Sequence, residues 1–200
     1  MTQKLVSRLI EAIANSIIAN AEVLTTLDQA IGDGDHGANM RRGAKALKTQ
    51  CDEISSLEFA AALKKAGTAI VMTVGGASGP LYGSALLGMA KAASGVPKNA
   101  KEASVVVRAG IDAVKARGKS DAGAKTMLDV LVPVQSEIES GSSIARIRTV
   151  AEESLEATKP MLAKKGRAAF LGERSIGHAD PGAKSAALIV HAICDVLEAQ

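Results

Sequence analysis

Apolar residues recur every three or four positions along most of the chain, which is the spacing of one face of an α-helix. In residues 3–25 this apolar stripe consists of Val6, Leu9, Ile13, Ile17 and Leu24. The spacing resumes after each polar or glycine-rich interruption, and no segment shows the alternation of a strand. We therefore predict eight helices, over residues 3–25, 39–49, 56–74, from Pro80 onward, and over 100–117, 126–140, 143–164 and 180–199.

Residues typical of helix ends support these boundaries. Asp180 is a good N-cap and Pro181 fits the first helical position, whereas Pro160 is expected to kink or end the helix over 143–164. Short connections favour antiparallel neighbours, so we expect an all-α, eight-helix up-and-down barrel or bundle within a single domain, residues 1–200. The longest loop, 165–179, is a candidate for function.

Composition and charge narrow the class of protein. Aromatic residues make up 2% and tryptophan is absent, so small aliphatic side chains must fill the core, which suits closely packed helices. A net charge of +3 is too small to indicate nucleic acid or a membrane surface as partner. Cys51 and Cys194 form neither a metal motif nor a disulfide framework, and Arg8 and Glu11 interrupt the first apolar stretch. We therefore expect a cytoplasmic protein without signal peptide or membrane span.

The segment AIGDGDHGANMRRG, residues 30–43, has glycines at the spacing of a phosphate-binding loop but also carries carboxylates. A dinucleotide-binding turn would follow a strand and lack those carboxylates, so that interpretation fails. A calcium-binding EF-hand loop starting at Asp33 would need glutamate where Ala44 stands. The Gly-Lys-Ser at 118–120 lacks the first glycine of a P-loop, which would fall at Ala113, and it is better explained as a helix end.

Asp28, Asp33 and Asp35 place three carboxylates within eight residues. Packed together they would repel one another, so a cation should lie among them, and ligands that are all oxygen favour a hard cation. Magnesium is typically held by one or two carboxylates together with substrate phosphates, so the loop would hold phosphate through metal. The alternative is that Asp28 ends a helix and the other two form turns, and spacing alone leaves it open.

Two further glycine-rich segments precede predicted helices. VGGASGPLYG, residues 74–83, offers backbone N–H groups and a helix dipole to an anion, or serves close helix packing. KKGRAAFLGERSIGHADPG, residues 164–182, supplies Arg167 and Arg174, which suit bidentate phosphate contact unless they are merely solvated. Three such segments in one helical chain favour a phosphate-bearing ligand.

These segments, with RGKSDAGAKTMLD at 117–129, together resemble the L-subunit family of dihydroxyacetone kinases, in the same order over nearly the whole chain. The resemblance implies an eight-helix barrel that binds ADP and two magnesium ions at one end. It implies metal ligation by Asp28, Asp33 and Asp35. The nucleotide contacts that it implies are His36, Gly37, Ala38, Asn39, Ala77, Ser78, Gly118, Met127, Arg167, Asp180, Pro181 and Gly182.

The resemblance is to the phosphotransferase-system branch, because the fused ATP-dependent kinases usually carry Thr or Cys in place of His36 and do not preserve GERSIGH. It implies that ADP stays bound as a coenzyme, receives phosphate from a phosphohistidine on an M-type protein and passes it to dihydroxyacetone on a K subunit, so that the chain acts in trans. Metal-bound aspartates and Arg167 would supply the catalysis, since phosphoryl transfer needs mainly positioning and charge neutralisation.

Several alternatives stay open on the sequence. The chain could serve an ATP-dependent dihydroxyacetone or tetrulose kinase, act as an ADP-dependent regulator of a transcription factor, or form a homodimer. His36 could contact phosphate, orient a metal-bound aspartate, or be held by a backbone hydrogen bond. Met127 is better explained as core or pocket wall than as a specific ligand.

Overall fold

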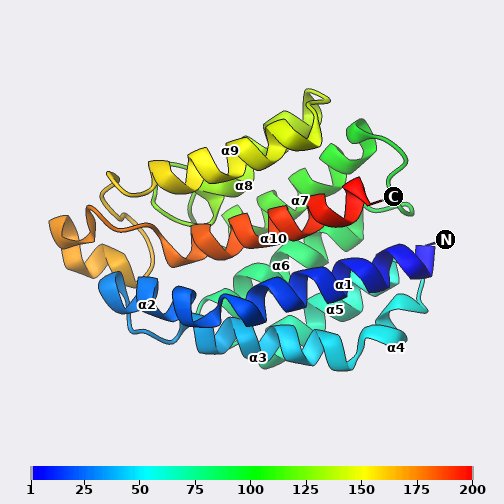
Figure 1. Ribbon diagram of the computed structural model, residues 1–200, viewed down its shortest axis with the longest axis horizontal. Helices are drawn as coiled ribbons and strands as arrows, with labels where there is room; N and C mark the ends of the chain where they lie inside the picture. Colours follow the sequence, from blue (N-terminus) through cyan, green and yellow to red (C-terminus); the bar gives the residue numbers. More distant parts are fainter. Residues whose placement is uncertain (1, 200) are drawn as a thin grey trace.

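The computed structural model describes residues 2–199, which contain helices and no strand. Figure 1 shows their arrangement. The elements are α1 (Thr2–Ala19), α2 (Ala21–Ile31), α3 (His36–Thr49), α4 (Cys51–Ser55), α5 (Phe59–Thr73), α6 (Ser78–Ala92), α7 (Ala100–Gly118), α8 (Leu128–Glu139), α9 (Ile144–Ala157), the 3-10 helix η1 (Arg167–Ser175) and α10 (Pro181–Glu198).

The long helices form a closed ring. Going round it, α1 packs on α3, and α3 on α5; α6, α7, α8, α9 and α10 follow, and α10 returns to α1. Neighbours in the ring run in opposite directions (Figure 1). The predicted all-α up-and-down architecture is therefore confirmed, with α2 as a continuation of α1 and with the short α4 and η1 as additions at the two ends.

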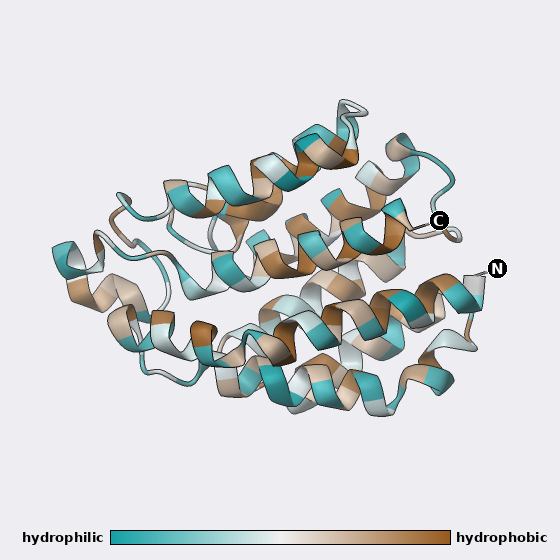
Figure 2. Ribbon diagram, in the orientation of Figure 1, coloured by the Kyte–Doolittle hydropathy of each residue, from teal (hydrophilic) through white to brown (hydrophobic). Residues whose placement is uncertain are grey.

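The inward faces of the helices are apolar. Figure 2 shows hydrophobic positions turned toward the interior and hydrophilic positions toward solvent. Leu24, Val130 and Ala186 are fully buried, and burying apolar surface stabilises by about 25 cal/mol per Å². The interior still holds an apolar cavity of about 350 Å³, with Ile13 and Ile189 in its wall. Among residues 2–199, no helix has the length and hydropathy to cross a membrane.

The predicted first helix, residues 3–25, is wrong at its C-terminal end. The chain turns at Asn20, whose side-chain amide donates to the carbonyl of Ser16 at 2.8 Å. It then continues as α2 to Ile31, so Asp28 lies on a helix rather than in the glycine-rich turn. The periodic apolar stripe crosses this break unchanged, because one turn residue barely shifts the face that points inward.

Other helix ends also differ from the predictions. α3 begins at His36 rather than near residue 39, and α6 begins two residues before Pro80, because the first turn of a helix needs no N–H from proline. α9 ends at Ala157, ahead of Pro160, instead of reaching 164. The predicted loop 165–179 contains η1, and α4 falls where no helix was predicted.

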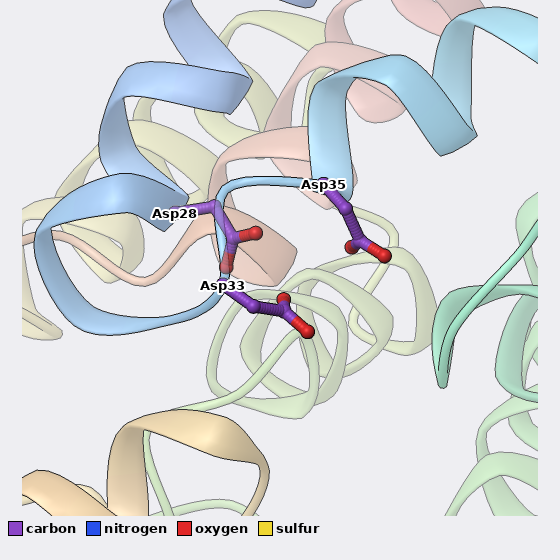
Figure 3. A group of neighbouring side chains, drawn as sticks. All are labelled: Asp28, Asp33 and Asp35. Atoms are coloured by element: carbon purple, nitrogen blue, oxygen red, sulfur yellow. The ribbon is translucent and has the colours of Figure 1, made fainter.

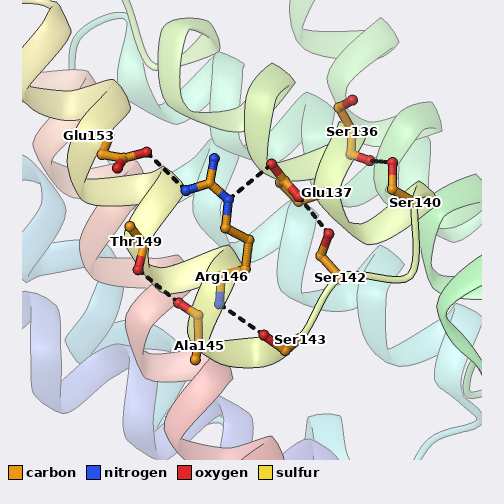
Figure 4. Close-up of polar contacts among 9 residues, drawn as sticks. All are labelled: Ser136, Glu137, Ser140, Ser142, Ser143, Ala145, Arg146, Thr149 and Glu153. Carbon is orange, nitrogen blue, oxygen red and sulfur yellow. Dashed lines mark hydrogen bonds and ion pairs between the residues drawn. The ribbon is translucent and has the colours of Figure 1, made fainter.

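A polar cluster closes the turn between α8 and α9, at the end of the molecule where both chain termini lie (Figures 1 and 4). The hydroxyl of Ser143 accepts the Arg146 N–H at 3.2 Å, which caps α9. The Arg146 guanidinium lies 3.4 Å from Glu137 of α8 and 3.3 Å from Glu153 of α9, and Ser142 donates to Glu137 at 2.5 Å. Exposed pairs of this kind contribute little stability, so they mainly orient the turn.

Candidate functional site

The opposite end of the ring is where α3, α6, α8 and α10 all begin. The first N–H groups of a helix lack partners within it, and its dipole places positive partial charge there. A pocket of about 180 Å³ opens between these helix starts, and its wall includes His36 of α3, Ser78 of α6, Pro181 of α10 and Met127, the N-cap of α8. This end of the barrel therefore favours an anionic ligand.

The three predicted metal-binding aspartates come together beside this pocket (Figure 3). Asp28 lies on the last turn of α2, Asp33 in the following loop, and Asp35 immediately before α3. Each offers a carboxylate oxygen, and these oxygens lie within 4.8 Å of one another. Asp28 is buried and accepts the backbone N–H of His36 at 3.1 Å. The cluster could hold divalent cations that prefer oxygen ligands.

Glycines permit the turn that brings these acids together. A Cβ atom at Gly32 would lie 2.1 Å from the Asp28 carboxylate, and Gly34 has a φ of +75°. A Cβ atom at Gly37 would lie 1.9 Å from the carbonyl oxygen of Ala21, so only glycine lets α3 start this close to α2. The glycines of the first motif thus shape a carboxylate cluster instead of wrapping a phosphate directly.

The second glycine-rich segment lies against the start of α3. Gly76 has a φ of +63°, and a Cβ atom there would be 3.8 Å from the Asp35 carboxylate. Ala77 and Ser78 follow it and line the pocket. Asn39 contacts the same segment from the side, since a Cβ at Gly75 would lie 2.6 Å from its Oδ1.

The imidazole of His36 joins three helix starts. Its Nδ1 lies 3.0 Å from the Ser78 hydroxyl of α6, and its Nε2 lies 3.0 Å from the Ser185 hydroxyl of α10. Ser185 also donates to the carbonyl of Gly182 at 3.0 Å and lies 2.7 Å from the Tyr82 hydroxyl. The ring therefore braces the pocket, a role that the sequence did not suggest.

The protonation state of His36 follows from these partners. Burial lowers the pKa of His36, while the charges of Asp28 and Asp35 act in the opposite direction. Because Ser185 gives its proton to a carbonyl, we assign the imidazole proton to Nε2, which leaves Nδ1 to accept from Ser78. A neutral ring in this tautomer fits both hydroxyl contacts.

The third segment brings Arg167 to the aspartates. Its guanidinium lies 3.1 Å from the Asp33 carboxylate, and 72% of the Arg167 side chain is exposed. An exposed pair of this kind is weak, so the guanidinium can turn to a bound anion at little cost. Arg174, the other arginine of the segment, is exposed and does not line the pocket.

Asp180 caps α10 from the floor of the site. Its carboxylate accepts the Ala183 N–H at 2.7 Å and is buried. Burial raises the pKa of Asp180 to about 7, with a further rise from Asp129 and opposing effects from its backbone hydrogen bonds and from Lys125. Asp129 itself accepts the backbone N–H groups of Gly123 at 2.5 Å and Thr126 at 2.7 Å, which fixes the loop before α8.

The structure places most predicted site residues at the pocket, but not all of them. Gly37, Ala38, Asn39 and Gly118 do not line it; Gly118 ends α7 beside Leu81. The predicted residues that do line it are Asp28, Asp33, Asp35, His36, Ala77, Ser78, Met127, Arg167, Asp180, Pro181 and Gly182. Four further residues, which no sequence pattern singled out, help to build the site: Tyr82, Lys125, Asp129 and Ser185.

Comparison with known proteins gives consistent matches. Residues 30–195 match the family model described as DAK2 domain. The ADP-binding subunit DhaL of PEP-dependent dihydroxyacetone kinase 1 from Listeria innocua is 48% identical over 87% of this chain and 86% of its own length. The corresponding DhaL of Escherichia coli is 40% identical over 82% and 83%.

A solved structure resembles the fold. The crystal structure of the dihydroxyacetone kinase of C. freundii superposes with a TM-score of 0.79 at 21% identity, over 96% of this chain and 34% of that one. The same protein is known in complex with AMP-PNP and Mg²⁺. At this identity the likeness concerns the fold alone, and this chain spans about a third of that kinase.

Proposed function

This chain belongs to the DAK2 domain family, among the ADP-binding DhaL subunits of dihydroxyacetone kinases, and from that premise we propose a specific role for it. It holds ADP with two magnesium ions at the helix starts of the barrel. The nucleotide takes a phosphoryl group from the phosphohistidine of an M-type protein and gives it to dihydroxyacetone on a K subunit. The proposal of these two partners, and of a cytoplasmic location, rests on the same family membership.

The observation that carries the proposal is the pairing of an acidic cluster with an anion-attracting pocket. Three carboxylates converge within 4.8 Å, yet the helix starts beside them favour negative charge. A diphosphate bound through divalent cations satisfies both features, because the cations meet the carboxylates and the phosphates meet the N–H groups. The donor set contains only oxygen, so it fits magnesium.

The residues of the chain have distinct tasks in this proposal. Asp28, Asp33 and Asp35 hold the magnesium ions, which neutralise charge on the phosphate oxygens when bound. Arg167 leaves Asp33 to contact the phosphates, and the backbone around Ala77 and Ser78 supplies N–H donors. Phosphoryl transfer needs positioning and charge neutralisation rather than a nucleophile on this chain. The substrate is activated on the partner subunit.

Protein purified without added nucleotide tests the coenzyme role. After denaturation, mass spectrometry should detect ADP close to one per chain, because a coenzyme that stays bound survives purification. Asp28→Asn should carry none if ADP is held through metal, whereas Asp112→Asn, which changes an exposed acid on α7, should carry as much as the wild type. Nucleotide-free wild-type protein that exchanges ADP freely would contradict a resident coenzyme.

Reconstitution tests the phosphoryl donor. With a K subunit, an M-type protein and the general carrier proteins, phosphoenolpyruvate should support dihydroxyacetone phosphorylation, while ATP alone should give at most a single turnover. Relatives named for phosphoenolpyruvate dependence support this expectation. Multiple turnovers with ATP and a K subunit alone would instead establish an ATP-dependent kinase. A regulatory role toward a transcription factor and a homodimer stay predictions.

A further inference from the structure

Lys125 is a buried charge beside the proposed nucleotide pocket. Lys125 lies in the loop between α7 and α8 and lines the pocket, yet it is only 1% exposed. Its φ of +61° is left-handed, which is uncommon for a residue with a side chain. Lysine is almost never fully buried unless its ammonium has partners, so we expect the ammonium of Lys125 to be hydrogen-bonded.

The ammonium of Lys125 is surrounded by carbonyl groups of a single segment. It donates to the backbone oxygens of Lys159 at 3.4 Å, Met161 at 3.1 Å and Ser175 at 2.5 Å. These bonds use all three N–H groups of the ammonium. All three acceptors belong to residues 158–176, the segment that leads from α9 toward α10 and carries Arg167.

Some other contacts of the segment involve the same residues, whereas the Lys164 N–H donates to the carbonyl of Ala124 at 3.1 Å, next to the lysine. The carbonyl of Lys159 also accepts the Gly177 N–H at 2.8 Å, and the hydroxyl of Ser175 accepts the Ala163 N–H at 3.0 Å. The apolar contacts beneath the segment form a small cluster of buried residues, Ile31, Ala163 and Ala168. Because so little apolar surface holds the segment, its placement depends strongly on the lysine.

We propose that Lys125 is a positioning residue of the phosphoryl-transfer site: its ammonium fixes segment 158–176 at the pocket and so places Arg167 beside Asp33. The part concerning Arg167 and nucleotide rests on the function proposed above, whereas the hold on the segment does not. A methionine at this position would keep the length of the side chain but leave buried carbonyls without their donor. The segment would then loosen while the ring of helices stays closed.

Hydrogen exchange in the nucleotide-free protein tests the hold on the segment. In Lys125→Met, the amides of Ala163 and Gly177 should lose protection at least tenfold relative to wild type, while amides in the middle of α7 and α8 keep theirs. Lys119→Met is the matched control, since Lys119 is an exposed, left-handed lysine of the same loop. Unchanged protection of the segment in Lys125→Met would overturn the proposal.

A double-mutant cycle with Arg167→Ala tests the consequence for nucleotide. The dissociation constant of ADP in excess magnesium, measured by calorimetry, should rise about tenfold in Lys125→Met. Arg167→Ala should then add little to that loss, because the guanidinium is already displaced, and Lys125→Arg should restore most of the affinity. Independent, multiplicative losses would show that Lys125 does not act through Arg167, and would overturn the proposal.

The two experiments separate this inference from the proposed function. If the wild-type protein binds no ADP, the proposed function fails, and the exchange experiment alone decides whether Lys125 holds the segment. If Lys125→Met does not fold, Lys125→Gln retains two N–H donors without the charge and gives a milder version of both tests. The inference would also be overturned by a Lys125→Gln protein whose hydrogen exchange equals that of the wild type and in which Arg167→Ala lowers ADP affinity as much as it does in the wild type.

Discussion

At the scale of single residues, the three aspartates of the site differ in their surroundings. Asp28 is buried and receives a backbone hydrogen bond, whereas Asp33 and Asp35 are exposed and Asp33 pairs with Arg167. The sequence predicted all three because carboxylates close together need a counter-charge. It left open whether Asp28 ends a helix or lies in the turn, because an acid near a helix end has the same appearance as one in a turn, and the structure places it on α2.

We expect Asp28→Asn, Asp33→Asn and Asp35→Asn each to lower phosphoryl transfer by about a hundredfold or more, because each removes a charged ligand of the proposed metals. Far-UV circular dichroism should remain that of the wild type. Asp112→Asn serves as control, being an exposed acid on α7 far along the chain from the cluster. Retained turnover in all three variants would remove the metal assignment.

Asp180 predicts a pH dependence of stability. Its pKa of about 7 in the folded protein lies above the ordinary value of 3.8, so the native state binds a proton that the unfolded state has released. The contribution of this group to the free energy of unfolding is therefore fully present below pH 4 and is lost as the pH rises through 7. At about 1.4 kcal/mol per pKa unit, the loss amounts to a few kcal/mol.

Asp180→Asn should remove that dependence while keeping the cap of α10, because the amide oxygen can still accept the Ala183 N–H. Urea unfolding of nucleotide-free protein at pH 5 and pH 8 measures the effect. The wild type should lose more stability between these pH values than the variant. Equal losses in both proteins would show that Asp180 is already ionised at pH 5.

The residues that the sequence did not reveal act through burial and long-range contact. Lys125 looks like an ordinary loop lysine, since nothing in its neighbours indicates a 1% exposed side chain. Ser185 and Tyr82 lie in helices whose periodicity accounts for them as packing residues, yet they continue the hydrogen bonds of His36. Partners about 100 positions apart become visible only when the helices are assembled.

At the scale of helices, each long element overlaps a predicted helix, the one that became α6 being predicted from Pro80, but the ends differ. The start of α3 at His36 was missed because Gly37 argues against a helix, whereas the structure needs a glycine there for close approach to Ala21. α4 was missed for a different reason, because its 5 residues are too few to show a helical period. Where a local preference and a tertiary contact disagree, the contact decides.

Gly37→Ala tests this contact between α2 and α3. The added methyl group would meet a backbone carbonyl at 1.9 Å, so we expect the free energy of unfolding to fall by about 3 kcal/mol, the upper end of overpacking effects. Gly118→Ala is the control, because its nearest neighbour is the end of the Leu81 side chain at 3.3 Å. Thermal unfolding should leave Gly118→Ala near the wild type; equal melting temperatures for Gly37→Ala and wild type would contradict the packing argument.

At the scale of the whole molecule, the closed ring follows from contacts that no local pattern contains. Short loops predicted antiparallel neighbours correctly, but the pairing of α1 with α10 joins the two ends of the chain. Arg8 of α1 donates to the carbonyl of Val196 at 3.1 Å across this seam. Although α10 begins at the pocket, the two chain ends lie at the other end of the ring, away from the pocket (Figure 1).

A circular permutant tests this separation of the chain ends from the site. Joining the present ends with a flexible linker and opening the chain in the turn at Gly141 should give a folded protein that binds ADP within about threefold of the wild type. Opening the chain instead at Gly166, next to Arg167, should keep the helical spectrum but weaken ADP binding by tenfold or more. Loss of binding in both permutants would mean that the seam itself supports the pocket.

The position of Tyr82 has a practical consequence. It is the chain's single tyrosine and tryptophan is absent, so almost all near-ultraviolet absorbance and emission of the polypeptide arises at the wall of the pocket. Adenine absorbs strongly against so weak a background, and the phenol is hydrogen-bonded to the His36 brace through Ser185. Ligand occupancy and rearrangement of the site should therefore be readable optically in the unlabelled wild-type protein, without any engineered probe.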